Sequence, residues 1–215
     1  LNNKNIKLAI QKKGRLTNDT INFLRKSGLI FKSYNQKLFS VCRDFPLEIL
    51  FVRDDDIPYY VSSGVVDLGI VGENIIFEEK PRIKKLFNLK YGFCSLILAV
   101  PNGSNVQEPK DLSGMTIATK YLNSTNNFFR KNNINVNILK INGCVEIVPA
   151  LGIADAITDL TSTGKTLAIN DLRILATLYK SQASLIANKN NLVNGKKLLL
   201  KQLITRFSSV LSKKF

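Results

Sequence analysis

Short apolar runs alternate with amphipathic segments along the chain. Apolar runs bounded by polar turns predict strands, and apolar residues that recur every three or four positions predict helices. The predicted strands are 6–10, 38–41, 47–52, 65–71, 94–100, 115–119, 136–141, 154–158 and 174–179. The predicted helices are 17–28, a short one that ends near 64, 122–132, one that begins near 164, and 193–211. Because strands separated by helices form parallel sheets covered on both faces, we expect an α/β protein.

Polar and glycine residues mark the ends of these elements. Thr17 is placed as an N-cap of the first helix, and Asp55 or Asp56 as a cap of the second. Asp67 falls inside a predicted apolar strand, where a carboxylate costs several kcal/mol unless it is paired or lies at a cleft. The segment 101–114 is rich in Pro, Gly, Asn and Ser and predicts a lobe boundary nearby.

Charge changes this picture little. The 215 residues include 31 Lys and Arg against 16 Asp and Glu, a net charge of +15, and no acidic residue follows Asp171. Such a charge prompts a search for nucleic acid, but neither a nucleic-acid-binding motif nor a cluster of stacking aromatics is present. We therefore expect compositional bias or a solvated or interface-facing basic tail, and no nucleic-acid partner.

Missing residue types exclude whole classes of chemistry. The chain has no histidine, which excludes histidine bases, histidine-ligated zinc and Ser-His or Cys-His triads. Cys42, Cys94 and Cys144 are far apart and form no CxxC pair, so buried reduced thiols are expected. No apolar run reaches the length of a membrane span, and residues 1–7 show no signal peptide. The prediction is a cytoplasmic protein without a membrane partner.

The stretch 154–167 is the most informative candidate site. It combines an apolar strand, the acids Asp155 and Asp159, small hydroxyl residues around Gly164, and a helix start. Hydroxyl groups, a glycine that admits close backbone approach and free N–H groups at a helix start suit a phosphate, and the acids suit ribose hydroxyls. A threonine-capped helix that follows a strand, with no ligand, is the alternative.

Two further patterns are ambiguous. Gly164-Lys165-Thr166 is similar to the end of a P-loop, but that motif requires a glycine where Asp159 stands, which excludes it. Arg53-Asp54-Asp55-Asp56 could suggest a metal site, but three acids at a helix start also suit the helix dipole, which we favour. The basic turn 11–16 follows the first strand, where α/β sheets bind ligands.

The order of the motifs points to a family. Lys-Gly-Arg-Leu, Arg-Asp-Asp-Asp-Ile-Pro, Val-Asp-Leu-Gly-Ile-Val-Gly, Ile-Ala-Thr-Lys-Tyr, Asn-Gly-Cys-Val-Glu and Ala-Asp-Ala-Ile-x-Asp-Leu-x-Ser-Thr-Gly-x-Thr-Leu follow one another along the chain. This series resembles the catalytic part of the ATP phosphoribosyltransferases. The resemblance implies a two-lobed, type II periplasmic-binding-protein-like α/β fold with the active site in the cleft. Its lobes would be 1–92 with 178–215, and 93–177, with no C-terminal regulatory domain.

The resemblance also implies an activity. The family consists of pentosyltransferases that condense ATP with 5-phosphoribosyl-1-pyrophosphate to N1-(5-phosphoribosyl)-ATP and pyrophosphate, the first step of histidine biosynthesis. Mg²⁺ accompanies the pyrophosphate and has no direct protein ligand. By motif, the sugar donor would be held by Asp155, Asp159, Thr161, Ser162, Thr163, Gly164 and Thr166. ATP and pyrophosphate would be held by Lys12, Gly14, Arg15 and Asp67, with Arg53 and Glu146 as further cleft residues.

Two readings of the assembly stay open. The chain resembles either a short form, which works with a regulatory subunit similar to histidyl-tRNA synthetase, or a long form without its regulatory domain. A homodimer, a homohexamer or a hetero-oligomer would follow. The competing functional hypothesis is a non-catalytic two-lobed module that binds an anion or another solute.

Overall fold

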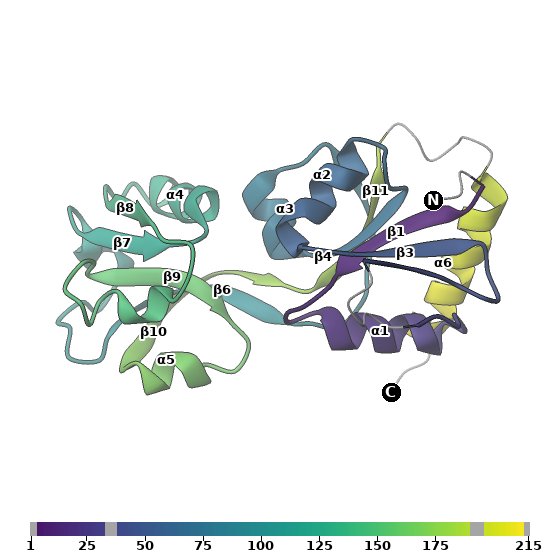
Figure 1. Cartoon of the computed structure of the whole chain (residues 1–215). Coiled ribbons are helices and arrows are strands. Elements are labelled where there is room, and N and C mark those ends of the chain that lie inside the picture. Colours follow the sequence, from purple (N-terminus) through teal and green to yellow (C-terminus); the bar gives the residue numbers. More distant parts are fainter. Residues whose placement is uncertain (1–3, 33–37, 190–195, 213–215) are drawn as a thin grey trace. The chain divides into compact units, whose positions relative to one another are not determined.

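The computed structural model describes residues 4–32, 38–189 and 196–212, and the chain divides into two compact units (Figure 1). Unit 1 contains Leu1–Ile76, Lys80–Gly92 and Gln182–Phe215, and unit 2 contains Phe77–Glu79 and Phe93–Ser181. These units differ from the expected lobes in two short segments, 77–79 and 178–181, which both belong to unit 2. In the structure, residues 178–181 group with unit 2 because strand β10 stays paired with β6 as far as Ser181.

Unit 1 is a six-stranded mixed sheet in the order β2-β3-β1-β4-β11-β5. The strand β1 pairs in parallel with β3 and β4, whereas β2 is antiparallel to β3, and β11 is antiparallel to β4 and β5. The strands are β1 (Ile6–Gln11), β2 (Phe39–Val41), β3 (Leu47–Val52), β4 (Leu68–Gly72), β5 (Ile83–Asn88) and β11 (Ala183–Asn188). Its helices are α1 (Thr17–Lys26), α2 (Ile57–Ser62) and α6 (Lys197–Ser212); α3 (Glu73–Glu79) begins in this unit.

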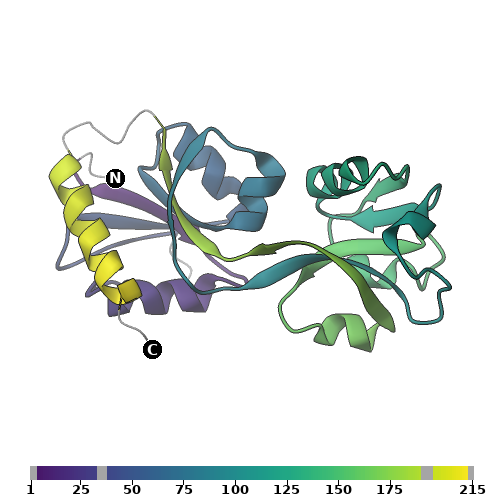
Figure 2. The same cartoon turned by 180° about the vertical axis from the view of Figure 1, so that it is seen from behind.

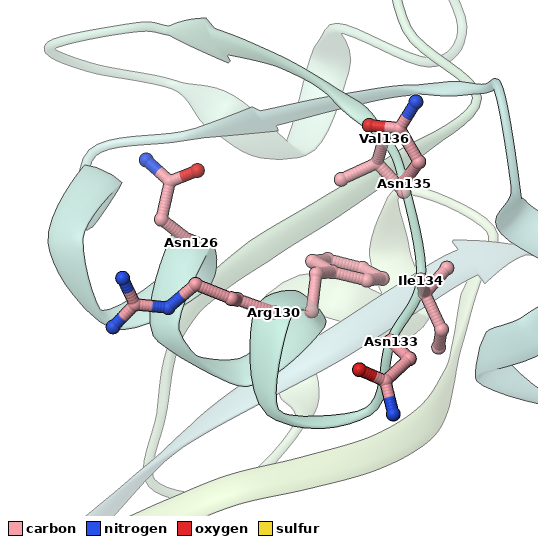
Figure 3. Close-up of a pocket in the computed structure, with 7 residues that line it drawn as sticks. Asn126, Arg130, Asn133, Ile134, Asn135 and Val136 are labelled. Carbon is pink, nitrogen blue, oxygen red and sulfur yellow. The ribbon is translucent and has the colours of Figure 1, made fainter.

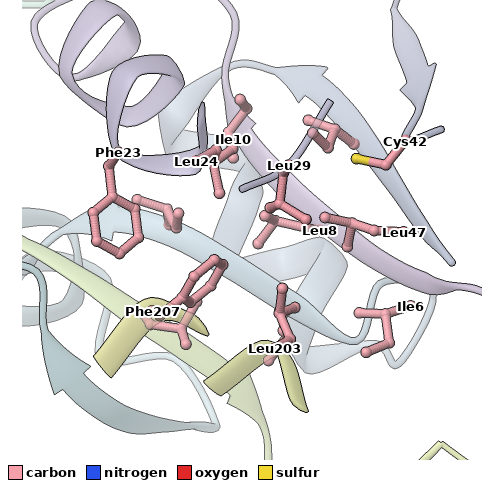
Figure 4. Packing of buried hydrophobic residues seen from close by; sticks show 14 of the residues in the cluster. Ile6, Leu8, Ile10, Phe23, Leu24, Leu29, Cys42, Leu47, Leu203 and Phe207 are labelled. Carbon is pink, nitrogen blue, oxygen red and sulfur yellow. The ribbon is translucent and has the colours of Figure 1, made fainter. Parts of the chain in front are cut away.

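Each face of this sheet is buried by its own hydrophobic cluster. Leu8 and Ile10 belong to the cluster under α1 and α6, while Ala9 belongs to the cluster under α2, as the alternation of a strand requires. Phe23 of α1 and Phe207 of α6 meet over the first face with ring centroids 5.1 Å apart (Figure 4). The last helix is therefore part of the core of unit 1.

Unit 2 is a five-stranded mixed sheet in the order β10-β6-β9-β7-β8. The strand β7 pairs in parallel with β9 and with the edge strand β8, and β6 is antiparallel to β9 and β10. The strands are β6 (Cys94–Pro101), β7 (Thr116–Thr119), β8 (Asn137–Lys140), β9 (Ala156–Thr161) and β10 (Leu172–Ser181), joined by the helices α4 (Leu122–Lys131) and α5 (Lys165–Ile169). Figure 2 shows the same elements from behind.

Several details differ from the sequence-based expectation. Both sheets are mixed, because β2, β6 and β11 run antiparallel to a neighbour. Only β2 and β3 are joined by a short connection, whereas β6 and β11 pair with strands that are remote in the sequence. Three elements were missed, namely α3, β5 and β11. The segment 101–114 lies inside unit 2, and the nearby boundary between the units falls between Gly92 and Phe93.

The expected helix caps also need correction. The N-cap of α1 is Leu16, so Thr17 lies inside the helix. Asp56 is the N-cap residue of α2, as expected, but its side chain makes no cap hydrogen bond. Part of the predicted helix 193–211 lies outside the described residues, and α6 is described from Lys197. Within the described part of the chain, no helix is long and apolar enough to cross a bilayer.

Candidate functional site

The carboxyl ends of three parallel strands meet at one edge of the sheet in unit 2. β7 pairs with both β8 and β9 in register, so the residues that follow these strands lie at the same edge. Lys120 follows β7, the 3-10 turn with Glu146 (Val145–Ile147) comes after β8, and Asp159 lies near the end of β9. Lys120 was not predicted as a site residue, although its place directly after a predicted strand was a usable signal.

Asp159 is the most perturbed acid of this edge. Burial in the protein raises the pKa of its carboxyl to about 6, and the negative charge of Glu146 contributes in the same direction. The backbone N–H of Leu160 and the cation of Lys120 act in the opposite direction. The carboxylate is therefore ionised at neutral pH but sensitive to mild acid, as functional carboxyl groups often are.

The hydroxyl loop directly follows Asp159. The Thr161 hydroxyl oxygen accepts a hydrogen bond of 2.9 Å from the Gly164 N–H, which closes the loop on itself. Gly164 has φ +74°, a left-handed conformation that favours glycine. Free backbone N–H groups were expected at this helix start to bind a phosphate, but the N–H of Gly164 is already hydrogen-bonded. The side chains of Ser162, Thr163 and Thr166 are exposed and present their hydroxyls to solvent.

Asp155 does not join this loop. It stands directly before β9, and its carboxylate accepts a hydrogen bond of 2.8 Å from the Thr116 N–H at the start of β7. Asp159 lies four positions further along the strand, a distance of about 13 Å at about 3.3 Å per residue. Asp155 therefore helps to hold β7 and β9 together at their amino ends, on the opposite edge of the sheet.

In unit 1, the basic turn lies at the carboxyl ends of β1 and β3. The Lys12 N–H donates to the carbonyl of Val52 at 2.9 Å, which places Lys12 next to the chain that leads into Arg53. The buried Gln11 side chain accepts a hydrogen bond of 2.9 Å from the Leu16 N–H and so closes the turn. A Cβ on Gly14 would lie 2.4 Å from Nε2 of Gln11, so the turn requires glycine there.

Arg15 is held by two segments that sequence analysis did not connect with it. Its guanidinium donates to the carbonyl oxygen of Gly92 and lies 3.5 Å from Oδ1 of Asn74. A Cβ on Gly72 would lie 2.2 Å from Oδ1 of Asn74 and 3.2 Å from Nη2 of Arg15. The glycine at the end of β4 therefore leaves the room in which Asn74 and the guanidinium meet.

Asp67 is not brought to this turn. It precedes β4 instead of lying within it, at the amino end of β1 and β4. Its carboxylate accepts hydrogen bonds of 2.8 Å from the Lys7 N–H and from the Lys196 ammonium. The carboxylate is thus paired within the unit, on the edge opposite to Lys12 and Arg15.

The remaining candidates are structural. Asp54–Asp56 form a 3-10 turn before α2, as the helix interpretation predicts, and the described residues contain no group of three or more metal-ligating side chains. Cys42 and Cys94 are buried free thiols, but Cys144 is exposed, contrary to the expectation of three buried ones.

A hollow of about 440 Å³ on unit 2 is a different surface. It lies beside the end of α4, and its polar side chains Asn126, Arg130, Asn133 and Asn135 are exposed and point in different directions (Figure 3). None of the residues at the carboxyl edge of this unit lines it. Because its polar groups do not converge, it offers no built ligand site.

Comparison with known proteins gives one consistent family. The family model of ATP phosphoribosyltransferase matches residues 53–209. The ATP phosphoribosyltransferase of Cytophaga hutchinsonii is 42% identical over 205 residues, which cover 95% of this chain and 71% of the relative. That of Methanosarcina barkeri is 41% identical over 211 residues, which cover 97% of this chain and 72% of the relative.

Solved structures agree in fold. A chain of the ATP phosphoribosyl transferase HisG:HisZ complex from Thermotoga maritima is 28% identical with a TM-score of 0.78, and the match covers 95% of this chain and 99% of that one. The substrate-binding protein of an amino acid ABC transporter matches at 17% identity with a TM-score of 0.61, which shows the type II two-lobed fold alone. The expected fold class is confirmed, and from the family model and the two curated relatives together, the chain belongs to the ATP phosphoribosyltransferase family.

Proposed function

We propose that the chain transfers the 5-phosphoribosyl group of 5-phosphoribosyl-1-pyrophosphate to N1 of ATP and releases pyrophosphate, the first step of histidine biosynthesis. Family membership supports this reaction over a solute-binding module, since the likeness to binding proteins rests on fold alone. The observation in the molecule that carries the proposal is Asp159, a carboxylate of raised pKa directly before a loop of hydroxyl groups.

The sugar donor binds at the carboxyl edge of unit 2. Thr161, Ser162, Thr163, Gly164 and Thr166 surround its 5-phosphate with hydroxyl and backbone donors. The ionised carboxylate of Asp159 accepts hydrogen bonds from the ribose hydroxyls. The charges of Lys120 and Glu146 lie close enough to act on the Asp159 carboxyl. Asp155 is omitted, because its carboxylate is engaged at the other end of β9.

The nucleotide and pyrophosphate bind at the basic turn of unit 1. Lys12 and Arg15 supply cations for these polyanions, and Gly14 permits close approach of the backbone. Arg53 lies next to Lys12 at the same edge. Asp67 is omitted, since its carboxylate pairs with Lys196 at the opposite edge. That both edges face a common cleft stays a prediction.

The chemistry suits a chain without histidine. N1 of adenine already carries a lone pair, so no base is needed to create the nucleophile. The sugar carbon gains positive character as pyrophosphate leaves, and cationic side chains stabilise the leaving group while the protein aligns the two substrates. No single acid or base residue is expected.

Mg²⁺ fits this scheme as a companion of the substrate. The described residues offer no cluster of three ligands, whereas Mg²⁺ is commonly held by substrate phosphates, water and one or two carboxylates. Substrate phosphates and water would then supply its ligands, and no protein carboxylate is assigned to it. When bound, Mg²⁺ neutralises charge on the departing pyrophosphate.

The assembly is a hetero-oligomer with a regulatory subunit or a homo-oligomer. The solved relative from Thermotoga maritima belongs to a HisG:HisZ complex, which supports the first. Native mass measurement with and without a candidate regulatory subunit distinguishes these two assemblies.

A direct assay tests the function. The protein is incubated with ATP, the sugar donor, Mg²⁺ and pyrophosphatase, with and without a candidate regulatory subunit. We expect phosphoribosyl-ATP to accumulate, because removal of pyrophosphate drives the reaction forward. If the protein binds either substrate in calorimetry but forms no product under any of these conditions, the solute-binding hypothesis replaces the enzyme.

Gly164→Val tests the place of the hydroxyl loop. A Cβ at Gly164 meets no atom within 4 Å, so the cost to folding comes from the left-handed backbone alone, about 1–2 kcal/mol. We expect calorimetric binding of the sugar donor to weaken more than tenfold, because the valine covers the loop and alters its backbone. Gly114→Val is the matched control, since Gly114 has φ +79° and an equally open Cβ position at the other end of β7. Equal binding by both variants would contradict the assignment.

A further inference from the structure

Three buried threonine hydroxyls meet behind the carboxyl edge of unit 2. Thr119 ends β7, Thr158 is its partner in β9, and Thr125 lies in the first turns of α4. All three residues are 0% exposed. The hydroxyl oxygens of Thr119 and Thr158 are 2.7 Å apart, and those of Thr125 and Thr158 are 2.5 Å apart. These three residues form what we call the threonine cluster.

Every hydroxyl of the cluster has an acceptor for its hydrogen. Thr119 donates to the carbonyl oxygen of Thr158 at 2.9 Å, Thr158 donates to Oγ1 of Thr119, and Thr125 donates to Oγ1 of Thr158. The backbone N–H of Tyr121 donates to Oγ1 of Thr119 at 2.8 Å. Such a fully satisfied buried network holds its members in one arrangement.

The network ends at two residues of the proposed sugar-donor site. Lys120 lies between Thr119, which belongs to the cluster, and Tyr121. The backbone N–H of Tyr121 donates to Oγ1 of Thr119, and its carbonyl oxygen lies 2.7 Å from Oγ1 of Thr125. Asp159 directly follows Thr158, whose carbonyl group is oriented by the Thr119 hydroxyl. Because neighbouring strand residues point to opposite faces, the cluster holds β9 from the α4 face while the Asp159 carboxyl lies on the other face.

We propose that the threonine cluster is a positioning device that sets the places of Lys120 and Asp159, and through them the geometry in which the sugar donor is held. The inference rests on the proposed function of this edge. The hydroxyls themselves touch no substrate, since they are fully buried. The hydroxyl is the required group, because valine, of nearly the same shape as threonine, would fill the space without the hydrogen bonds.

The test compares Thr158→Val with Thr158→Ser, which restores the hydroxyl, and with Thr177→Val, an exposed threonine of β10. We expect Thr158→Val to lower kcat/KM for the sugar donor about tenfold or more, since small displacements of positioning groups cost up to about 100-fold. Thr158→Ser and Thr177→Val should stay near the wild type. If Thr158→Val does not fold, Thr125→Val serves in its place, because it leaves the bonds between the two strand threonines intact.

A carboxyl NMR titration of Asp159, assigned with Asp159→Asn, provides a readout that does not depend on activity. We expect Thr158→Val to move the midpoint from about 6 toward the ordinary 3.8, because loosening of β9 lets water reach the carboxyl. An unchanged midpoint and unchanged sugar-donor kinetics, even with a lower melting temperature, would show that the cluster only stabilises the fold. If the midpoint shifts in Thr158→Val but the wild type forms no phosphoribosyl-ATP, the result would support the cluster and overturn the proposed function instead.

Discussion

Asp159→Asn is expected to lower kcat/KM for the sugar donor about 100-fold. The substitution keeps the size of the side chain but replaces a charged acceptor, whose hydrogen bonds are worth about 1.5–3 kcal/mol each. The steady-state rate at varied sugar donor and saturating ATP measures this effect. Asp155→Asn is the matched control, because that carboxylate bonds the Thr116 N–H at the other end of the same strand. A larger loss in Asp155→Asn than in Asp159→Asn would contradict our assignment of the ribose contact.

The raised pKa of Asp159 predicts how kcat/KM of the wild type depends on pH, with Asp159→Asn as the reference. In the wild type, kcat/KM for the sugar donor should fall as the pH drops through about 6, because the protonated carboxyl is a poorer acceptor. The substrate phosphates also titrate in this range, but they do so equally with both proteins. The ratio of wild type to Asp159→Asn therefore isolates the carboxyl and should decline below pH 6. A ratio that is constant from pH 5 to pH 8 would refute this role.

The stability of Asp159→Asn should change in the opposite direction to its activity. Burial penalises the ionised carboxylate, so the variant is expected to be more stable at pH 7–8. The pKa of Asp159 is about 6 in the folded protein against an ordinary 3.8. This difference corresponds to a gain in unfolding free energy of at most about 3 kcal/mol, at about 1.4 kcal/mol per pKa unit. The gain should shrink as the pH falls through 6 and vanish below 3.8. Urea unfolding at several pH values measures it.

Phe207→Ala is expected to lower the free energy of unfolding of unit 1 by about 3–5 kcal/mol. Phe207 is 0% exposed and packs against Phe23, so its removal leaves a cavity between α6, α1 and the sheet. Hydrogen exchange of the β1 amides reports the stability of this unit by itself. Leu198→Ala on the same helix is the control, because Leu198 is 68% exposed and should cost little. A loss below about 1 kcal/mol for Phe207→Ala would mean that α6 is dispensable to the core.

Much of the fold was predictable because the signals are local. β1, β3 and β6 are continuous apolar runs, which can be recognised from a few neighbouring residues. The apolar spacing of α6 places Phe207 on its buried face. β5 was missed because two lysines interrupt its pattern, and its pairing with β11 joins segments about 100 residues apart. The prediction of parallel sheets was wrong for the same reason, since no local pattern shows with which remote strand a segment pairs.

The candidate site shows the same division. The sequence by itself determined the family motif, the hydroxyl loop after Asp159 and the basic turn after β1, because each is a short run whose residue types suit a polyanion. Only the tertiary structure decided that Asp67 and Asp155 lie at the opposite edges from these loops and that Lys120 lies near Asp159. The pKa of a carboxyl depends in turn on burial and charges contributed by residues far away in the chain.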